Sequence, residues 1–452
     1  MKNKKKYIFI ITILLLCSII MYLLNENHGL KESSNNYENN KVTKHENMLS
    51  MMLETSAGSG NYEMTSRSEW PTDGYIFNTE LSKCENGSEL SWDDINKRVV
   101  MSGNKSDKCY VYFDIKPQVL LANYIKSLYT GTQGNNGIYY HDANLTNGAG
   151  DNSYRYAGAS ENVDNFVCFG STTPCPTDNL YRIIGVFGDK VKLIKYDYAN
   201  SNLLGTDGDY STTTFSKSGY STYKGELTTI NRYYWNNSTQ NNTWSESNLN
   251  KVNLNTNFIT NIGADWAAKI DTTTWKVGGN TPTNIVRQRA RTAYQNEIVN
   301  PVTTNTADNK TEYSAKIGLM YASDYGFAAA QSAWTSNLYD YNGEAIKNVN
   351  WMYMGLYEWT ISRRADTSNN AFFVYFDGGV YDYYGVISDG SGVRPSFNLS
   401  SSITYVSGSG SANDPIVINW LTDSFEKTTV KPSKKEVKSS TNVERFTSFF
   451  EL

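Results

Sequence analysis

The longest apolar stretch of the chain lies close to its first residue. Residues 7–24 are uncharged and mostly apolar, and Lys2, Lys4, Lys5 and Lys6 precede them. About 18 helical residues span roughly 27 Å, close to the hydrocarbon thickness of a bilayer. Because lysines tend to stay on the cytoplasmic side, residues 1–24 are predicted to be cytoplasmic lysines and a single-pass transmembrane anchor. The bulk of the chain after the anchor would then be extracellular.

Two other interpretations of this stretch remain open. A cleaved signal peptide ends in small residues, whereas residues 25–29 contain no Ala-x-Ala pattern. Lipoprotein processing at Cys17 would need a small residue before the cysteine, and residues 14–16 are leucines. A buried globular helix is disfavoured because the run has no polar face.

A polar segment and a short β pattern follow the apolar run. Residues 25–69 are predicted to be a flexible stalk, with the clearest linker composition at 31–36 and 56–60. In the next region, 70–116, apolar and polar residues alternate from Cys109 to Asp114, as in a half-buried strand. Residues 99–101 precede that strand across a turn-prone stretch, which predicts a hairpin in a small β module.

The region 117–420 mixes helical and strand patterns. After Pro117, apolar residues at 120, 121, 124, 125 and 128 lie on one helical face. The strongest hairpin pattern joins 180–187 to 190–197, with Gly188 at the first central position, as a type II′ turn requires. Helices are also predicted over 245–262 and around 327–333.

Strand patterns return towards the end of this region. Phe372, Val374 and Phe376 alternate with their neighbours, a turn follows at 377–379, and 380–387 is predicted to run back. Residues 393–399 include Pro395 and predict a closing edge strand, since proline cannot donate within a ladder. Residues 416–420 are the last predicted strand, and 421–452 read as a polar, basic tail.

Composition limits the classes of partner. The formal charge is −4 and the pI is about 5.6, so the chain lacks the basic surface that nucleic acids require. Charged residues make up only 19% and tyrosines number 34, which suits an extracellular β-rich protein. An AT-rich genome would produce much of the same bias.

Four of the five cysteines form two local pairs. They are Cys84 with Cys109 and Cys168 with Cys175, and outside the cytosol such pairs favour disulfides. Zinc is the competing interpretation. Neither pair has Cys-x-x-Cys spacing, and no histidine is near either one.

Several segments make the chain resemble a known group. The run 168–185 (Cys-Phe-Gly through Arg-Ile-Ile-Gly), together with 136–142 and 323–329, resembles surface proteins of clostridia and related Firmicutes. Trp70-Pro71 and residues 108–114 resemble a companion module of that group. The resemblance covers most of 70–420, but the group itself is largely uncharacterised.

A more distant similarity concerns the fold. Residues 358–360, a glycine-turned hairpin and 392–395 are similar to the end of C-type-lectin-like domains, including the sulfatase-modifying, formylglycine-generating family. The similarity implies an α+β fold: an anchor helix, a small disulfide-stapled β module and a lectin-like domain rich in antiparallel strands. No cysteine follows Cys175, so the late cysteines used by the enzymatic branch are missing and formylglycine generation is not expected.

Catalytic motifs are sparse. His141 is the single histidine of the predicted folded region, where it is expected in a polar loop; no nucleophile elbow or phosphate-binding loop is evident. Paired carboxylates for glycoside hydrolysis stay possible, and Glu358 and Asp366 are candidates, although Glu358 is expected to pair with Arg363 or Arg364. Residues 206–209 are acidic and turn-like but lack the ligand pattern of an EF-hand.

The candidate binding site is a cluster of tyrosines and aspartates within 371–391. Tyrosine offers rigid, amphipathic contact area, and aspartate can accept hydrogen bonds from sugar hydroxyls or a peptide. The alternative is that alternate tyrosines pack in the core. The cluster comprises Tyr375, Asp377, Tyr381, Asp382, Tyr383 and Tyr384.

The sequence therefore predicts a non-catalytic, membrane-anchored bacterial surface protein that binds an extracellular glycan or protein, with no cofactor and no metal. Arg394 is expected to be a buried partner of a carboxylate or of backbone carbonyls. An extracellular glycan hydrolase with paired carboxylates, or a structural envelope protein, are the alternatives.

Overall fold

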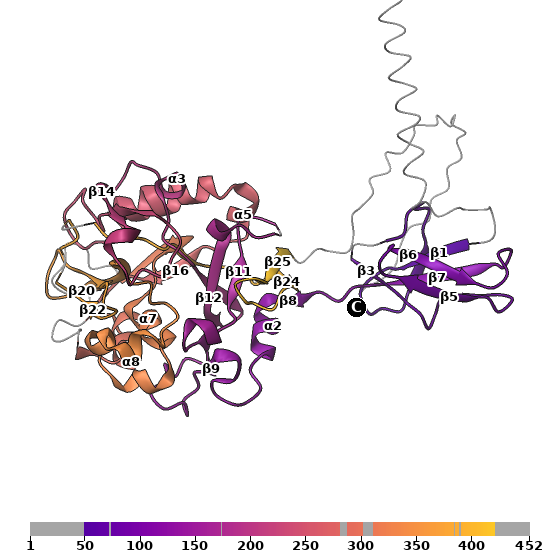
Figure 1. Ribbon diagram of the computed structural model, residues 1–452, viewed down its shortest axis with the longest axis horizontal. Helices are drawn as coiled ribbons and strands as arrows, with labels where there is room; N and C mark the ends of the chain where they lie inside the picture. Colours follow the sequence, from indigo (N-terminus) through magenta and orange to yellow (C-terminus); the bar gives the residue numbers. More distant parts are fainter. Residues whose placement is uncertain are drawn as a thin grey trace, which may run out of the picture. The chain divides into compact units, whose positions relative to one another are not determined.

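The computed structural model describes residues 49–71, 74–172, 174–280, 287–301, 311–383, 385–387 and 390–420 (Figure 1). The described residues fall into two compact units, a smaller one within 49–117 and a larger one within 118–420. The predicted anchor and the predicted basic tail lie outside the described residues. Within the described ranges, no helix is both long and apolar enough to cross a membrane.

The smaller unit is built on a five-stranded sheet around one central strand. Its order is β2-β1-β7-β3, with β4 also paired to β7, and a separate hairpin joins β5 to β6. The strands are β1 (Leu49–Glu54), β2 (Tyr62–Met64), β3 (Tyr75–Phe77), β4 (Lys83–Cys84), β5 (Glu89–Asp93), β6 (Arg98–Ser102) and β7 (Cys109–Ile115). The predicted alternation in β7 is confirmed, because its odd-numbered residues are buried and its even-numbered ones are half-buried.

Two expectations for this unit need correction. The segment expected to be stalk up to residue 69 contributes β1 and β2, and β1 runs parallel to β7 with Met51 buried in the core. The sheet thus includes residues from Leu49 onward. The predicted hairpin partner was also wrong, since β6 pairs with β5 while β7 pairs with β1, β3 and β4. The pairing of β1 with β7 joins strands that are far apart in the sequence, and no local sequence pattern indicates such a pairing.

The larger unit contains a seven-stranded sheet of order β19-β23-β13-β12-β10-β9, with β11 paired to β12. Its strands are β9 (Ile138–Tyr140), β10 (Tyr154–Tyr156), β11 (Phe166–Cys168), β12 (Leu180–Phe187), β13 (Lys190–Lys195), β19 (Ile317–Gly318) and β23 (Ser396–Asn398). The β12–β13 hairpin is confirmed with its two-residue connection. Gly188 has φ +65°, as the first central position of a type II′ turn requires.

The predicted edge strand at 393–399 is instead an interior strand. β23 pairs with β13 on one side and with β19 on the other. Pro395 lies immediately before β23, so its missing N–H removes no ladder bond, and its carbonyl accepts a hydrogen bond from the Lys195 N–H at 3.0 Å. The proline therefore marks the start of the strand, not an edge.

A second sheet of four strands has the order β17-β20-β21-β22. Its members are β17 (Gly279–Asn280), β20 (Glu358–Arg364), β21 (Ala371–Val374) and β22 (Val380–Tyr381). All of β21 is buried, so the alternation of 372–376 does not mark a solvent face. The predicted return strand over 380–387 is reduced to β22.

Smaller sheets complete the strands of the larger unit. They are β14 (Tyr210–Ser216) with β15 (Thr229–Tyr233), β16 (Thr273–Lys276) with β18 (Glu312–Ala315), and β25 (Val417–Trp420) with β24 (Ile403–Ser407) and β8 (Val119–Leu120). β25 corresponds to the last predicted strand.

Helices are short, and most lie between strands. The α-helices are α2 (Leu121–Ser127), α3 (Ser201–Leu204), α4 (Ile259–Asn261), α5 (Ala264–Ala268), α6 (Ala290–Tyr294), α7 (Ala322–Ala328) and α8 (Glu344–Lys347). Two π-helices are η6 (Leu249–Phe258) and η8 (Gln295–Val299). The 3-10 turns are η2 (Asn135–Gly137), η3 (Ser160–Asn162), η4 (Thr177–Asn179), η5 (Lys217–Gly219), η9 (Gln331–Thr335) and η10 (Leu338–Asn342).

The helical predictions are confirmed in outline. The helix expected over 245–262 is η6 continued by α4. The helix after Pro117 is α2, and the one around 327–333 is divided between α7 and η9.

One large apolar core fills the larger unit, including the fully buried Trp235, Trp244, Trp334 and Trp359. The architecture is thus mixed and rich in antiparallel sheet, an α+β class. In Figure 1, β12 crosses the middle of this unit, and α7 lies on the same side of it as β20 and β22.

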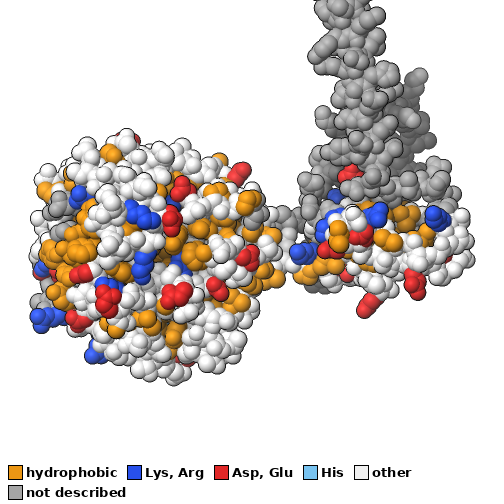
Figure 2. All heavy atoms as spheres, viewed as in Figure 1, with side chains coloured by type: hydrophobic (Ala, Val, Ile, Leu, Met, Phe, Trp, Pro, Cys, Tyr) orange, Lys and Arg blue, Asp and Glu red, His pale blue; other side chains and the backbone are white. Residues whose placement is uncertain are grey.

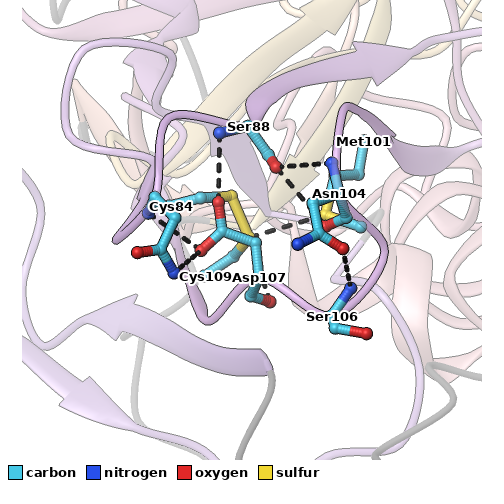
Figure 3. The surroundings of a disulfide bond; sticks show 8 residues. Cys84, Ser88, Met101, Asn104, Ser106, Asp107 and Cys109 are labelled. Carbon is cyan, nitrogen blue, oxygen red and sulfur yellow. Dashed lines mark hydrogen bonds between the residues drawn. A yellow bond between two sulfur atoms is a disulfide. The ribbon is translucent and has the colours of Figure 1, made fainter.

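Both predicted disulfides are present. Cys84 is bonded to Cys109 in the smaller unit and Cys168 to Cys175 in the larger one. Figure 3 shows the first bond beside Asp107, whose carboxylate accepts the N–H groups of Asn86 at 2.9 Å and Ser88 at 3.1 Å. The disulfide and this carboxylate together fix the loop that follows β4.

Candidate functional site

Six aromatic side chains form a contiguous surface at the β21–β22 connection, here called the aromatic surface. Tyr375 is at its centre, with ring centroids 4.5 Å from Phe376, 4.7 Å from Tyr357 and 5.0 Å from Tyr381. Tyr381 in turn lies 5.0 Å from Tyr339 and 5.4 Å from Tyr383. Tyr383 is 51% exposed and Tyr339 is 41% exposed, while the other four are half-buried. In Figure 2, hydrophobic side chains, with tyrosine among them, reach the surface of the larger unit near β20.

The aromatic surface rests on a rigid base. Phe373 of the buried strand β21 packs against Tyr381 and Tyr383 at 6.0 and 5.5 Å. The turn at 377–379 needs a glycine, because Gly378 has φ +99°, and its carbonyl accepts a hydrogen bond of 2.8 Å from the Tyr325 hydroxyl. The position of the tyrosines is therefore fixed by the core, which limits the entropy lost on binding a ligand.

A second set of rings, from a neighbouring hairpin, packs against the aromatic surface. Phe215 of β14 stacks on Tyr357 at 5.5 Å, and Tyr220 lies 6.2 Å from both Tyr357 and Phe376. The Arg232 guanidinium lies 4.4 Å from the Phe215 ring. These residues come from segments more than 100 positions apart, so only tertiary folding brings them together.

The two aspartates of the predicted cluster are engaged within the protein. Asp377 accepts the Gly379 N–H at 2.9 Å and the Tyr381 hydroxyl at 3.1 Å, so it orients Tyr381. Asp382 lies 3.7 Å from the Arg364 guanidinium, which also binds Asp366. Burial raises the pKa of Asp382, although Arg364 opposes the shift.

The structure thus brings together three of the predicted residues, Tyr375, Tyr381 and Tyr383, with Asp377 beneath them. Tyr384 lies outside the described residues. The aromatic surface also uses Tyr339 and Tyr357, which the sequence reasoning missed. Tyr339 follows an ordinary polar turn pattern, and no spacing links it to Tyr381.

Arg394 joins three elements near the same sheet. Its Nε donates to Glu358 at 2.7 Å, and its two Nη atoms donate to the carbonyls of Met352 at 2.8 Å and Tyr196 at 3.3 Å. Both charged side chains are at most 2% exposed. The expected buried role of Arg394 is confirmed, whereas the expected pairing of Glu358 with Arg363 or Arg364 was wrong.

Hydrolytic carboxylate pairing is not supported at the candidate residues. Glu358 is held by Arg394, and Asp366 accepts from Arg364 at 2.8 Å. Asp209, in the acidic turn, accepts backbone N–H groups of Asn237 and Leu249, which accounts for it without a cation. No group of three His, Cys, Asp or Glu side chains suited to a metal occurs among the described residues.

His141 lies in the loop after β9, as expected, but it is fully buried among aromatic side chains, which corrects the expected polar surroundings. Its ring packs 4.9 Å from Phe327 and 5.0 Å from Trp334, and its Nδ1 accepts the Ala149 N–H at 3.0 Å. Burial and the nearby Arg155 hold its pKa well below the ordinary value. His141 is therefore a neutral core residue.

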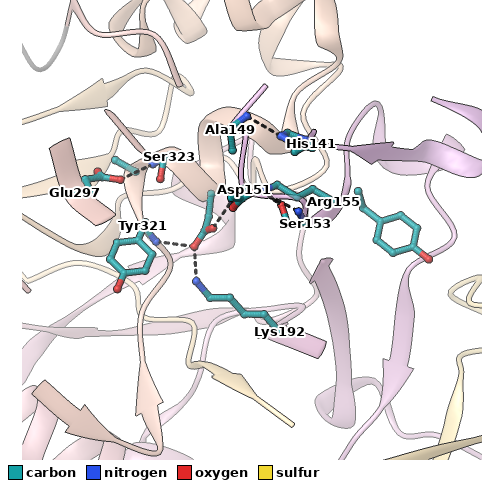
Figure 4. A network of polar contacts seen from close by, with 12 residues as sticks. His141, Ala149, Asp151, Ser153, Arg155, Lys192, Glu297, Tyr321 and Ser323 are labelled. Carbon is teal, nitrogen blue, oxygen red and sulfur yellow. Dashed lines mark hydrogen bonds and ion pairs between the residues drawn. The ribbon is translucent and has the colours of Figure 1, made fainter. Parts of the chain in front are cut away.

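Next to His141 lies a buried network of charged side chains (Figure 4). Arg155 of β10 donates to Asp151 at 2.6 Å, and Lys192 of β13 donates to Asp324 of α7 at the same distance. Burial alone would raise the pKa of Asp151, but Arg155 and Ser153 outweigh it and hold the pKa at about 2.

Glu297 is a further buried carboxyl group in this region. It accepts the Ser323 N–H at 3.1 Å and the Ser362 hydroxyl at 2.7 Å. Burial raises its pKa to about 7 from 4.5, and these hydrogen bonds only partly oppose the rise. The Glu297 carboxyl group thus binds its proton more tightly in the folded chain than in the unfolded chain.

The raised pKa of Glu297 predicts a pH-dependent stability. A carboxyl whose pKa is raised on folding stabilises below its unfolded pKa, and that contribution is lost as pH rises through about 7. Between about pH 5 and 8, the free energy of unfolding of the wild type should fall by roughly 2–3 kcal/mol relative to Glu297→Gln. Urea unfolding of both proteins at the two pH values measures this, and a pH-independent difference would contradict it.

Comparisons of the chain with protein-family models, with curated proteins and with solved structures gave no significant match.

Proposed function

We propose that this chain is a non-catalytic, membrane-anchored bacterial surface protein that binds an extracellular glycan through the aromatic surface. The observation that carries the proposal is the set of ordered tyrosine rings on a rigid sheet, two of them well exposed. Flat aromatic faces match the apolar faces of sugar rings, and tyrosine hydroxyls can bond to sugar hydroxyls. Because the tyrosine side chains are already ordered, little conformational entropy is lost when they contact a glycan.

Two further features support an extracellular setting. Both disulfides are the kind that persists in oxidising compartments. The apolar run 7–24 behind its lysines has the length and charge bias of an anchor with the lysines inside. A protein ligand would use the same tyrosines, and a structural envelope role would use none of them.

An extracellular hydrolase is the second candidate, but neither of the two candidate carboxylates favours it. Glu358 and Asp366 are each bound to an arginine, and Glu358 is 2% exposed. Glycan binding requires only the aromatic surface and no catalytic carboxylates, so we prefer it to hydrolysis as the proposed function.

The test uses intact cells that display the full-length chain, applied to an array of glycans and matrix proteins with and without EDTA. We expect EDTA-insensitive retention on particular glycan spots, lost after protease treatment of the intact cells. The double variant Tyr339→Ser with Tyr383→Ser should weaken retention at least about tenfold, since these are the two most exposed rings of the aromatic surface and tyrosine is among the residues that contribute most to binding interfaces.

The matched control is Tyr140→Ser. Tyr140 is a half-buried tyrosine of a separate aromatic group, stacked 4.6 Å from Tyr154. Equal retention by the wild type and the double variant, or equal loss in the control, would reject the aromatic surface as the site. Retention on matrix-protein spots alone would identify a protein ligand, and shortened glycans would identify a hydrolase.

A further inference from the structure

Lys192 and Asp324 form an unusual pair in the larger unit. The Lys192 ammonium lies 2.6 Å from Asp324 Oδ2, and the two side chains are 7% and 1% exposed. They are 132 residues apart in sequence, on β13 and α7. Two opposite charges have therefore been removed from water, and a buried ion pair is by itself weak support for stability.

The surroundings of the amine are aromatic. The Lys192 Nζ lies 4.7 Å from the ring centroid of Tyr321, 5.3 Å from that of Trp275 and 5.8 Å from that of Phe187. Burial lowers the pKa of Lys192, although Asp324 opposes the shift. The aromatic enclosure favours the neutral amine, which is the nucleophilic form of Lys192, because an uncharged amine needs less solvation than an ammonium.

The carboxyl group of Asp324 is surrounded by donors on both oxygens. Its Oδ2 accepts the Tyr321 N–H at 3.0 Å as well as the lysine, and its Oδ1 faces Arg155 Nη1 at 3.6 Å. That Nη1 is buried and has no hydrogen-bond partner within the described part of the chain. A fixed cation beside one oxygen and an N–H beside the other would stabilise the negative charge of a tetrahedral intermediate.

We propose that Lys192 and Asp324 are joined by an intramolecular isopeptide bond in the mature protein. The neutral Nζ attacks Cγ of the carboxylic acid, a C–N bond forms, one C–O bond breaks, and the departing oxygen leaves with two protons as water. Starting from the ammonium and carboxylate, the products are one amide and one water, so no further reactant is needed.

The geometry and the product both favour the step. A nitrogen at hydrogen-bond distance from Oδ2 lies close to the near-attack range of roughly 3–3.5 Å from the carboxyl carbon. The amide replaces two desolvated charges by a neutral group, and its carbonyl retains the Arg155 contact. The exclusion of water from the site would oppose hydrolysis of the bond.

The isopeptide bond would stabilise the elements that support the proposed binding site. It joins β13, in the large sheet, to α7, and Tyr325 of α7 holds the Gly378 carbonyl of the turn beneath the aromatic surface. The inference does not depend on the proposed function, however, because it rests on the buried pair alone.

The test is peptide mapping of the folded, full-length protein after reduction of its disulfides. Trypsin should fail to cleave after Lys192 and should yield residues 191–195 joined to 317–347, at the summed mass of the two peptides less one water. Lys192→Arg should release the linear 317–347 peptide in full yield.

Lys195 provides an internal control in the same strand. It is 3% exposed, like its neighbour, but no ion pair to a carboxylate is found for it among the described residues. Trypsin should therefore cleave after Lys195 in the branched peptide. Complete cleavage after Lys192, with linear 317–347 recovered from protein whose circular dichroism shows it to be folded, would overturn the proposal.

Discussion

Replacement of Arg394 by methionine should lower the free energy of unfolding of the larger unit by about 3–5 kcal/mol. The substitution removes the ion pair with Glu358 and leaves that carboxylate buried, 2% exposed, without its cation. It also releases the carbonyls of Met352 and Tyr196, which Arg394 binds from two other segments. Urea unfolding followed by tryptophan fluorescence measures the loss.

Arg364→Met is the matched control for this change. Arg364 pairs with Asp366 and Asp382 near the surface, where its side chain is 21% exposed, so its loss should cost no more than about 1 kcal/mol. Glu358→Gln should recover part of the stability of Arg394→Met, because an amide is less costly to bury than an unpaired carboxylate. Equal losses for the two arginine variants would show that burial of the pair is not what matters.

Removal of the Cys84–Cys109 disulfide should unfold the smaller unit and leave the larger one folded. The bond closes a separation of 25 residues, and the chain-entropy relation assigns it roughly 3–4 kcal/mol. The buried apolar cluster of this unit consists of Met51, Val111 and Phe113 with half-buried neighbours, so little else can offset the loss. Hydrogen exchange of the Cys84→Ala with Cys109→Ala variant should show lost protection throughout β1–β7 and retained protection in the strands of the larger unit.

The second disulfide serves as the comparison. Cys168–Cys175 closes a separation of 7 residues, for which the same relation gives roughly 2 kcal/mol, and it belongs to a unit with a far larger core. Its double alanine variant should therefore keep both units protected from exchange. Loss of protection in the larger unit, or full protection in the smaller unit without its disulfide, would contradict this account.

The elements that were predicted correctly are those determined by residues close to one another in the sequence. The β12–β13 hairpin followed from two apolar runs around Gly188-Asp189, and β7 from an alternation that the buried odd-numbered positions reproduce. The two disulfides followed from short separations between cysteines. In each case the residues that make the contact lie within about 25 positions of one another.

The errors concern contacts between distant segments. Pro395 was read as a sign of an edge, but β23 is interior because β13 and β19 pair with it from about 200 and 80 positions away. The sequence predicts that Glu358 pairs with Arg363 or Arg364, yet its partner is Arg394, from the segment that precedes β23. His141 lies in a loop, as expected, but Phe327 and Trp334 cover it, so its surroundings are aromatic and not polar.

By itself, the sequence determined the class of the fold, the cysteine pairing and the tyrosine-rich turn at 375–383, because backbone periodicity, turn chemistry and short loops act over a few residues. Only the tertiary structure decided which rings form the aromatic surface and which charges are buried together. Tyr339 reaches Tyr381, and Lys192 reaches Asp324, only after the core has folded. The physical reason is that packing and desolvation depend on which segments become neighbours, and no local pattern records that choice.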